Sequence, residues 1–343
     1  MTHTPTIAVD AMGGDHGPSV VVSGAVSAAR RFGVPIILFG DQGAVDAALQ
    51  SIDTTGVNVT VVGTTETIDM GDQPAQAVRR KPDSSLVRAI RAVKDGEAAA
   101  MVSAGNSGAV MAGALMSLGR IKGIDRPAIA ANIPSKTGMT LVLDLGAVTD
   151  PKPAHMVQFA IMGQTYARYV MNVPNPTVGL LSNGEEPSKG NQLTVAVHAL
   201  LRETPNISFY GNVEGKDIAL GTTDVVVTDG FTGNVALKVA EGTASYFVDS
   251  LREELTRTLI RKLAAAVLRP AFRAMARRMD YAEVGGAPLL GVDGTAIVSH
   301  GRSNERAIEN AIGVAIKSSE QNLASRIAEH IAQVPEEVAS ATV

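Results

Sequence analysis

The chain contains no cysteine, which excludes disulfide bonds, thiolate metal ligands and catalysis by a cysteine nucleophile. It also lacks an excess of positive charge, because 30 Lys and Arg against 34 Asp and Glu leave a formal net charge of -4. A basic surface is the usual mark of nucleic-acid binding, so we expect no nucleic-acid partner. The histidines show no spacing typical of a pair of metal ligands, and we expect neither a metal nor a cofactor.

Long apolar runs are missing as well. No uninterrupted apolar stretch is long enough to cross a bilayer, and residues 1–5 do not resemble a signal peptide. We therefore expect a cytoplasmic enzyme.

Short apolar runs that are typical of buried strands alternate with helical patterns along most of the chain. Residues 6–12 predict a strand followed by a helix over 19–31, and residues 35–40 predict a second strand with another helix after it. This alternation predicts the α/β class, with a mainly parallel sheet flanked by helices. We expect a single α/β catalytic domain over residues 1–332 and a flexible tail over 333–343.

Three glycine-containing turns each lie between a predicted strand and a predicted helix, at residues 13–18, 103–108 and 229–234. Free amides in the first turn of a helix bind anions, and small residues let the backbone approach a ligand closely. We therefore expect a site for phosphate or another part of the substrate at these turns. Its candidate residues are Asp10, Gly13, Gly14, Asp15, Ser103, Gly105, Asn106, Ser107, Gly108, Asp229, Thr232 and Gly233.

A polar loop at 182–191 is the main candidate for the active site. It follows the predicted strand 177–181, precedes a predicted helix at 192–201, and contains Lys189 with two carboxylates, Glu185 and Glu186. Ligands of open α/β sheets bind at the carboxyl ends of strands.

A basic amphipathic segment covers residues 251–280. Leucine and valine recur every fourth residue from 251 to 267, Pro270 interrupts the stripe, and from 252 to 280 eight Lys or Arg face three Asp or Glu. The pattern predicts a protruding amphipathic helical pair. It fits packing against the body or a second subunit, and equally contact with an anionic membrane surface or an acidic protein. The cations at 79–81 leave a similar choice between a solvated face and an acidic partner.

Several segments together resemble one family, the bacterial phosphate acyltransferases of phospholipid synthesis. The matching segments are 7–15, 103–109, 119–127, 184–191, 211–215, 229–234 and 281–291. The resemblance covers nearly the whole chain. Departures are mild, and the one at Val148 removes a polar group, so that position is left out of the site.

The resemblance implies a reaction in which acyl-[acyl carrier protein] and inorganic phosphate give acyl phosphate, used for phosphatidic acid, and the free carrier protein. It implies a fold similar to isocitrate and isopropylmalate dehydrogenases, a homodimer, and catalytic roles for Lys189 and Asn234. The carrier proteins of this family's reaction are strongly acidic. The segment 251–280 is also compatible with peripheral contact with the inner face of the membrane. Phosphate itself is the nucleophile, which agrees with the absence of cysteine.

Two alternatives belong to other classes. An NAD-dependent dehydrogenase on the related fold would need a cluster of aspartates for a metal and a nucleotide site, and the sequence shows neither. A non-catalytic scaffold for membrane or carrier protein would not explain four polar, glycine-containing loops.

Overall fold

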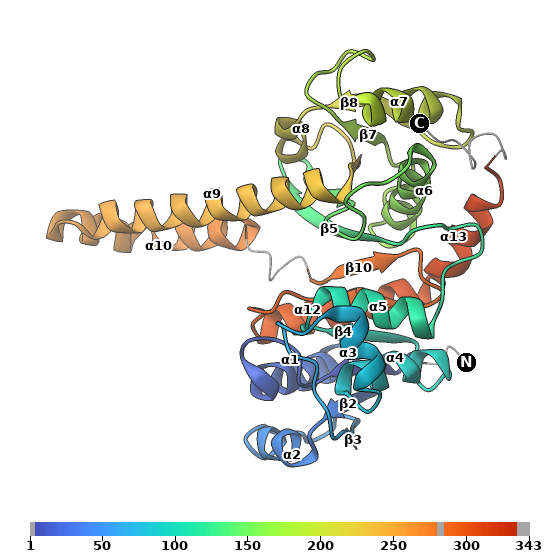
Figure 1. Cartoon of the computed structure of the whole chain (residues 1–343). Coiled ribbons are helices and arrows are strands. Elements are labelled where there is room, and N and C mark those ends of the chain that lie inside the picture. Colours follow the sequence, from blue (N-terminus) through green and yellow to red (C-terminus); the bar gives the residue numbers. More distant parts are fainter. Residues whose placement is uncertain (1–3, 280–284, 335–343) are drawn as a thin grey trace.

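The computed structural model describes residues 4–279 and 285–334. Within them, eleven strands form one sheet in the order β3-β2-β1-β4-β11-β10-β5-β6-β9-β7-β8. Figure 1 shows two lobes, with β10 between them and a long helical arm extending from one lobe. The mainly parallel α/β class predicted from the sequence is confirmed.

The first lobe consists of parallel strands with helices on both faces. Successive residues of a strand point to opposite faces, so Ile7 and Val9 pack with α1 and α12 while Ala8 packs with α4 and α5. Its strands are β1 (Ile7–Asp10), β2 (Ile36–Gly40), β3 (Val59–Gly63), β4 (Ala100–Ser103) and β11 (Ala296–Val298). Its helices are α1 (Gly17–Phe32), α2 (Gln42–Gln50), α3 (Pro74–Arg80), α4 (Ser85–Lys94), α5 (Ser107–Ser117) and α12 (Glu305–Glu320).

The second lobe is built around α6, whose side chains are buried almost throughout because strands, α7 and α13 surround it. Phe159 and Tyr166 on α6 are among the largest fully buried side chains. The strands of this lobe are β5 (Ala128–Ser135), β6 (Gly138–Leu143), β7 (Val178–Leu181), β8 (Phe209–Val213) and β9 (Val225–Val227). Its helices are α6 (Pro153–Tyr169), α7 (Gln192–Glu203), α8 (Gly215–Leu220) and α13 (Leu323–Ile331).

β10 (Ala287–Leu290) joins the lobes by pairing antiparallel with β11 on one side and β5 on the other. Leu290 is buried in the core of the second lobe and Leu289 in the core of the first. Residues 281–284 lie outside the described part of the chain. Because β5 and β6 are also antiparallel, β6 to β9 run opposite to β1 to β4.

The arm consists of α9 (Gly230–Thr256) and α10 (Leu259–Met279). The predicted helical pair is present, but it begins at 230 instead of 251, and its break lies at 257–258 instead of Pro270. Pro270 lies inside α10 and does not end the helix. A proline at this position removes one backbone hydrogen bond of the helix, and its ring conflicts with the carbonyl of the preceding turn. At the true break, the Thr258 hydroxyl accepts a hydrogen bond from the Arg261 amide (3.3 Å) and so starts the second helix.

After α13 (Leu323–Ile331), Gln333 and Val334 still contact the second lobe. Asn206 donates a hydrogen bond to the side chain of Gln333 (3.1 Å), and Val334 packs on the core of the second lobe. Residues 335–343 of the predicted tail lie outside the described part of the chain.

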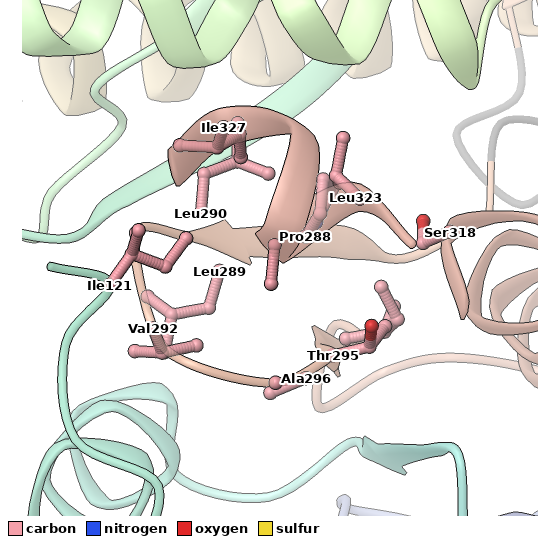
Figure 2. Close-up of a pocket in the computed structure, with 14 residues that line it drawn as sticks. Ile121, Pro288, Leu289, Leu290, Val292, Thr295, Ala296, Ser318, Leu323 and Ile327 are labelled. Carbon is pink, nitrogen blue, oxygen red and sulfur yellow. The ribbon is translucent and has the colours of Figure 1, made fainter. Parts of the chain in front are cut away.

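A small cavity lies where the lobes meet (Figure 2). Its volume is about 10 Å³, enough for one water molecule at most, and its lining is almost wholly apolar. Ser318 contributes a buried hydroxyl that finds no hydrogen-bond partner among the residues that the structure describes. In residues 4–279 and 285–334, no helix combines the length and apolar character needed to span a bilayer.

Candidate active site

The first two glycine turns pack together as one unit in the first lobe. Asp10 ends β1 and Ser103 ends the neighbouring strand β4 in register with it. The Ser103 hydroxyl donates to Asp10 Oδ2 (2.7 Å) and accepts from the Gly105 amide (3.0 Å). A Cβ on Gly13 would lie 2.6 Å from the Gly105 nitrogen, so only glycine permits this approach. We call these two turns the β1–β4 turns.

Asn106 caps α5 and connects the β1–β4 turns to the segment 70–72. Its Oδ1 accepts from the Ala109 amide (3.1 Å), while its Nδ2 donates to the carbonyls of Met70 (3.1 Å) and Asp72 (3.2 Å). The side chain is thus used within the protein. The amides of Ser107 and Gly108 lie in the first turn of α5, where backbone amides have no acceptor within the helix, and such amides can bind anions.

Burial raises the pKa of Asp10, and hydrogen bonds from neighbouring hydroxyls and amides oppose this rise without cancelling it. A carboxyl group whose pKa is higher in the folded state than in the unfolded state contributes to stability through its protonated form. The contribution is complete at a pH below the pKa of the unfolded state, which is 3.8 for Asp10. That contribution is lost as the pH rises through the folded-state pKa.

The Asp10→Asn variant lacks this titrating group. As the pH rises from the ordinary pKa of Asp10 to neutrality, the free energy of unfolding of the variant should therefore fall less than that of the wild type. Urea unfolding at a series of pH values measures this difference. Asp95→Asn, at an exposed position, is the control. A wild-type-minus-variant stability that does not change with pH would contradict the assignment.

The loop at 182–191 is held by its own backbone and by Asn212. The Lys189 amide donates to the Glu186 carbonyl (2.9 Å), and Asn212 Nδ2 donates to the same carbonyl (2.8 Å). Asn212 is buried and also bonds to His198 on α7 (2.9 Å). The Lys189 side chain is exposed.

The two carboxylates of this loop do not hold Lys189. Glu185 lies 3.6 Å from Lys216 Nζ, which also contacts Glu214. Carboxylate oxygens of Glu185, Glu214 and Asp217 lie within 4.8 Å of one another, as cation ligands would. Contacts within the protein explain why these carboxylates lie close together. Lys216 pairs with both Glu185 and Glu214, and the Asp217 carboxylate accepts a hydrogen bond from the Glu214 amide (2.9 Å).

The third glycine turn begins α9, and Asp144 at the end of β6 supports it. The Asp144 carboxylate accepts from the amides of Ile129, Gly146, Ala147 and Val148, at 2.6 to 3.2 Å. The Val148 carbonyl in turn accepts from the Gly230 amide (2.9 Å). Asp144 therefore organises the loop 144–148.

Glycine is required where α9 crosses this loop. A Cβ on Gly233 would lie 2.0 Å from the Asp144 carbonyl oxygen, and one on Gly230 would lie 2.6 Å from Asp144 Oδ2. Asp229 caps the helix by accepting from the Thr232 amide (2.8 Å). This close packing places the exposed side chain of Asn234 beside Gly146, at 3.8 Å from the position of a Cβ there.

The predicted site residues thus form two groups, one on each lobe. The residues from Asp10 to Gly108 surround the β1–β4 turns. Lys189, Asn234 and the residues at 229–233 belong to the second lobe, where β9 pairs with both β6 and β7. The loops that carry Asn234 and Lys189 therefore leave neighbouring strands.

The fold and these strand-end loops define a two-lobed α/β protein with a mainly parallel sheet, and solved structures share this fold. A phosphotransacetylase from Streptococcus pyogenes superposes with a TM-score of 0.64 over 93% of this chain and 95% of its own, at 15% identity. A Salmonella typhimurium protein assigned to the 4-hydroxythreonine-4-phosphate dehydrogenases superposes with a TM-score of 0.54 over 92% and 99%, at 13% identity. These likenesses confirm the dehydrogenase-like fold.

The family model described as "Fatty acid synthesis protein" matches residues 5–326, and the chain belongs to this family. A phosphate acyltransferase from Geotalea uraniireducens is 50% identical over 325 residues, covering 95% of this chain and 94% of the relative. One from Geobacter sulfurreducens is 51% identical, covering 94% and 93%.

Proposed function

We propose that this chain is an acyltransferase that moves a fatty acyl group from acyl carrier protein to inorganic phosphate and so forms acyl phosphate. The observation that carries the proposal is the placement of Lys189 and Asn234 on loops that leave the paired strands β7 and β9. Relatives that share half of the residues over nearly the whole chain are phosphate acyltransferases. The NAD-dependent dehydrogenase alternative is not favoured by these relatives.

In the proposed reaction, a phosphate oxygen attacks the carbonyl carbon of the thioester. The new C–O bond forms a tetrahedral oxyanion, the C–S bond then breaks, and the carrier thiolate leaves and takes up a proton. The Asn234 amide donates to the oxyanion, and the Lys189 ammonium balances the charge of phosphate or polarises the carbonyl. No protein nucleophile is needed, because phosphate is the attacking group.

Phosphate binding is proposed at the β1–β4 turns, through the amides at the start of α5 and the neighbouring glycines. Since Lys189 and Asn234 lie on the other lobe, the proposal requires both lobes to face one reacting centre. The direct test mixes the protein with acyl carrier thioester and phosphate and traps acyl phosphate with hydroxylamine. Hydroxamate no greater than in a control without enzyme would refute the function.

The acidic carrier protein is proposed to dock beside α3, where an open pocket of about 540 Å³ is lined by residues 73–76, Arg79 and Arg80. Both arginines are exposed, whereas Lys81 is used internally through an ion pair with Asp72 (2.6 Å). The run of three cations therefore divides into one structural lysine and two arginines that face solvent. The pocket adjoins the β1–β4 turns, since a Cβ on Gly108 would lie 2.7 Å from Pro74 at the start of α3.

Reversing both charges (Arg79→Glu with Arg80→Glu) should raise KM for the carrier thioester about tenfold, leave kcat nearly unchanged and weaken the salt dependence of KM. The matched control reverses two exposed cations at the far ends of other helices, Lys94 on α4 and Arg202 on α7. Equal effects of the two double variants would show that net charge, and not this surface, sets the affinity.

The arm is proposed to pair with a second copy of the chain and to contact anionic lipid at its outer part. Ile260 and Val267 on α10 are each 80% exposed, which is unusual for large apolar side chains in a monomer. Part of the basic character predicted for this segment is neutralised within the arm, because Arg257 and Arg261 pair with Glu254. Sedimentation velocity tests the dimer, and co-sedimentation with anionic phospholipid vesicles tests the lipid contact.

A further inference from the structure

Gly184 is buried within a loop whose other residues are mostly exposed. The loop 182–191 lies between β7 and α7 (Figure 1), and residues 185–192 are all exposed. The three atoms nearest to the position that a Cβ of Gly184 would occupy belong to two side chains of the same loop. They are Lys189 Cγ at 2.8 Å, Glu186 Oε2 at 3.1 Å and Lys189 Cβ at 3.3 Å. The stem of Lys189 therefore packs against the backbone of Gly184.

A tight turn brings Lys189 back to Gly184. The Lys189 amide donates to the Glu186 carbonyl (2.9 Å) and so closes a four-residue turn with Pro187 at its second position. Proline suits this position because its ring restricts φ to the value that common turns require there. The buried side chain of Asn212 donates to the same carbonyl (2.8 Å) and anchors the turn to β8. The backbone thus holds the start of the Lys189 side chain in one place.

Space, and not backbone conformation, selects glycine at 184. Its φ lies outside the left-handed region, so alanine could adopt the same backbone without strain. A methyl group there would instead meet Lys189 Cγ at 2.8 Å, whereas carbon atoms in contact lie about 3.5–4.0 Å apart. Because this atom belongs to the stem of the lysine, its displacement would move the ammonium group as well.

We propose that Gly184 is a positioning residue for Lys189, since the missing side chain lets the lysine stem pack on the loop and directs its ammonium group to the reacting centre. This inference rests on the proposed function. An exposed lysine has several rotatable bonds, and fixing them for catalysis costs conformational entropy. Contact with Gly184 restricts the first of these bonds before substrate binds. Gly184 itself touches neither phosphate nor the acyl group, and it acts through Lys189 alone.

The test adds one methyl group at this contact. Gly184→Ala is expected to lower kcat for acyl phosphate about tenfold and to raise KM for phosphate, with KM for the carrier thioester within about twofold of the wild type. Misplacing a catalytic group by about 1 Å can cost about 10²-fold, and the flexible outer part of the lysine recovers some of this loss. Hydroxamate trapping with each substrate varied in turn measures these values.

Gly215→Ala is the matched control. Gly215 is an exposed residue at the start of α8, in a neighbouring loop, and nothing lies within 4 Å of the position that its Cβ would occupy. The same substitution there should leave kcat and both KM values within about twofold of the wild type.

A double-mutant cycle separates an effect through Lys189 from a general distortion of the loop. In a Lys189→Ala background the Cγ atom is absent, so Gly184→Ala should cause less than about twofold further loss of activity. The melting temperatures of the four proteins give a readout that does not depend on residual activity. Gly184→Ala should lower the melting temperature when Lys189 is present and leave it unchanged in the Lys189→Ala background.

Three outcomes would overturn the inference. Unchanged kcat and phosphate KM in Gly184→Ala would show that Lys189 does not depend on this contact. An equal loss in the Lys189→Ala background would mean that residue 184 acts on the loop and not on the lysine. An equal loss in Gly215→Ala would assign the effect to any methyl group added in these loops. In all three cases the wild type still forms acyl phosphate, whereas a wild type that forms none would refute the proposed function itself.

Discussion

Replacing Asn234 with alanine is expected to lower kcat for acyl phosphate formation by about 10²–10³-fold. Removal of one oxyanion donor typically raises the barrier by about 3 kcal/mol, because the charge of the tetrahedral intermediate then lacks a preorganised partner. Asn234→Asp should be at least as damaging, since it replaces the donor with a negative charge. Lys189→Ala should cause a loss of similar size and also raise KM for phosphate. Single-turnover measurement of hydroxamate, with the donor saturating, reports the chemical step.

Two neighbouring lysines provide the controls for these variants. Lys238 lies one turn beyond Asn234 on α9 and pairs with Glu241 (2.8 Å), and Lys216 lies beside the loop of Lys189 and contacts Glu214. Alanine at either position should leave kcat within about twofold of the wild type, because exposed ion pairs contribute little. Phosphate-dependent turnover that survives in both Lys189→Ala and Asn234→Ala would refute the assignment of these two residues.

Replacing Asp144 with alanine is expected to cost about 3 kcal/mol of stability and most of the activity. Its buried carboxylate is the acceptor for four backbone amides, and a donor left without a partner away from water costs about 1–3 kcal/mol. Some of these amides are partly exposed and will regain a water, which limits the total. For a chain of 343 residues the melting temperature should fall by about 4 °C. Differential scanning calorimetry measures it.

The loss of activity in Asp144→Ala should follow from displacement of Asn234. The loop 144–148 contacts the first turn of α9 through the Val148 carbonyl and Gly230. Disorder of this loop in the variant should therefore move Asn234, the proposed oxyanion donor. Asp144→Asn keeps one acceptor oxygen and should lie between the alanine variant and the wild type in both stability and kcat. Asp46→Ala, on the exposed face of α2, should change the melting temperature by less than about 1 °C. A stable, fully active Asp144→Ala would contradict this account.

Local patterns predicted the elements that depend on a few consecutive residues. The alternation of strand and helix, the glycine turns at 13–18, 103–108 and 229–234, and the helical character of the arm can be recognised from neighbouring residues alone. The cap residues Asn106 and Asp229 also act within four positions of themselves. Such features are visible in a sequence because local sterics and local hydrogen bonds determine them.

Features that depend on distant contacts were missed or misplaced. β10 did not stand out, because four residues with a proline become a strand only where β11 and β5 supply partners on both sides. The break in the arm was assigned to Pro270, since proline is the strongest local signal, whereas the chain turns at 257–258. The ion pairs Lys81–Asp72 and Lys216–Glu185 likewise depend on how the loops pack in the folded protein.

The sequence by itself determined the class of fold, the family and the absence of any cysteine chemistry, and it supplied the segments proposed to carry the site. All of these are properties of residue type and short-range order. Only the tertiary structure decided how those segments are combined. The antiparallel pairings at β10 and β5 reverse the strand direction between the lobes and separate the β1–β4 turns from Lys189 and Asn234. The order β6-β9-β7 places the loops of Asn234 and Lys189 on adjacent strands. Strand pairing joins residues far apart in the chain, and no local pattern records which strands become neighbours.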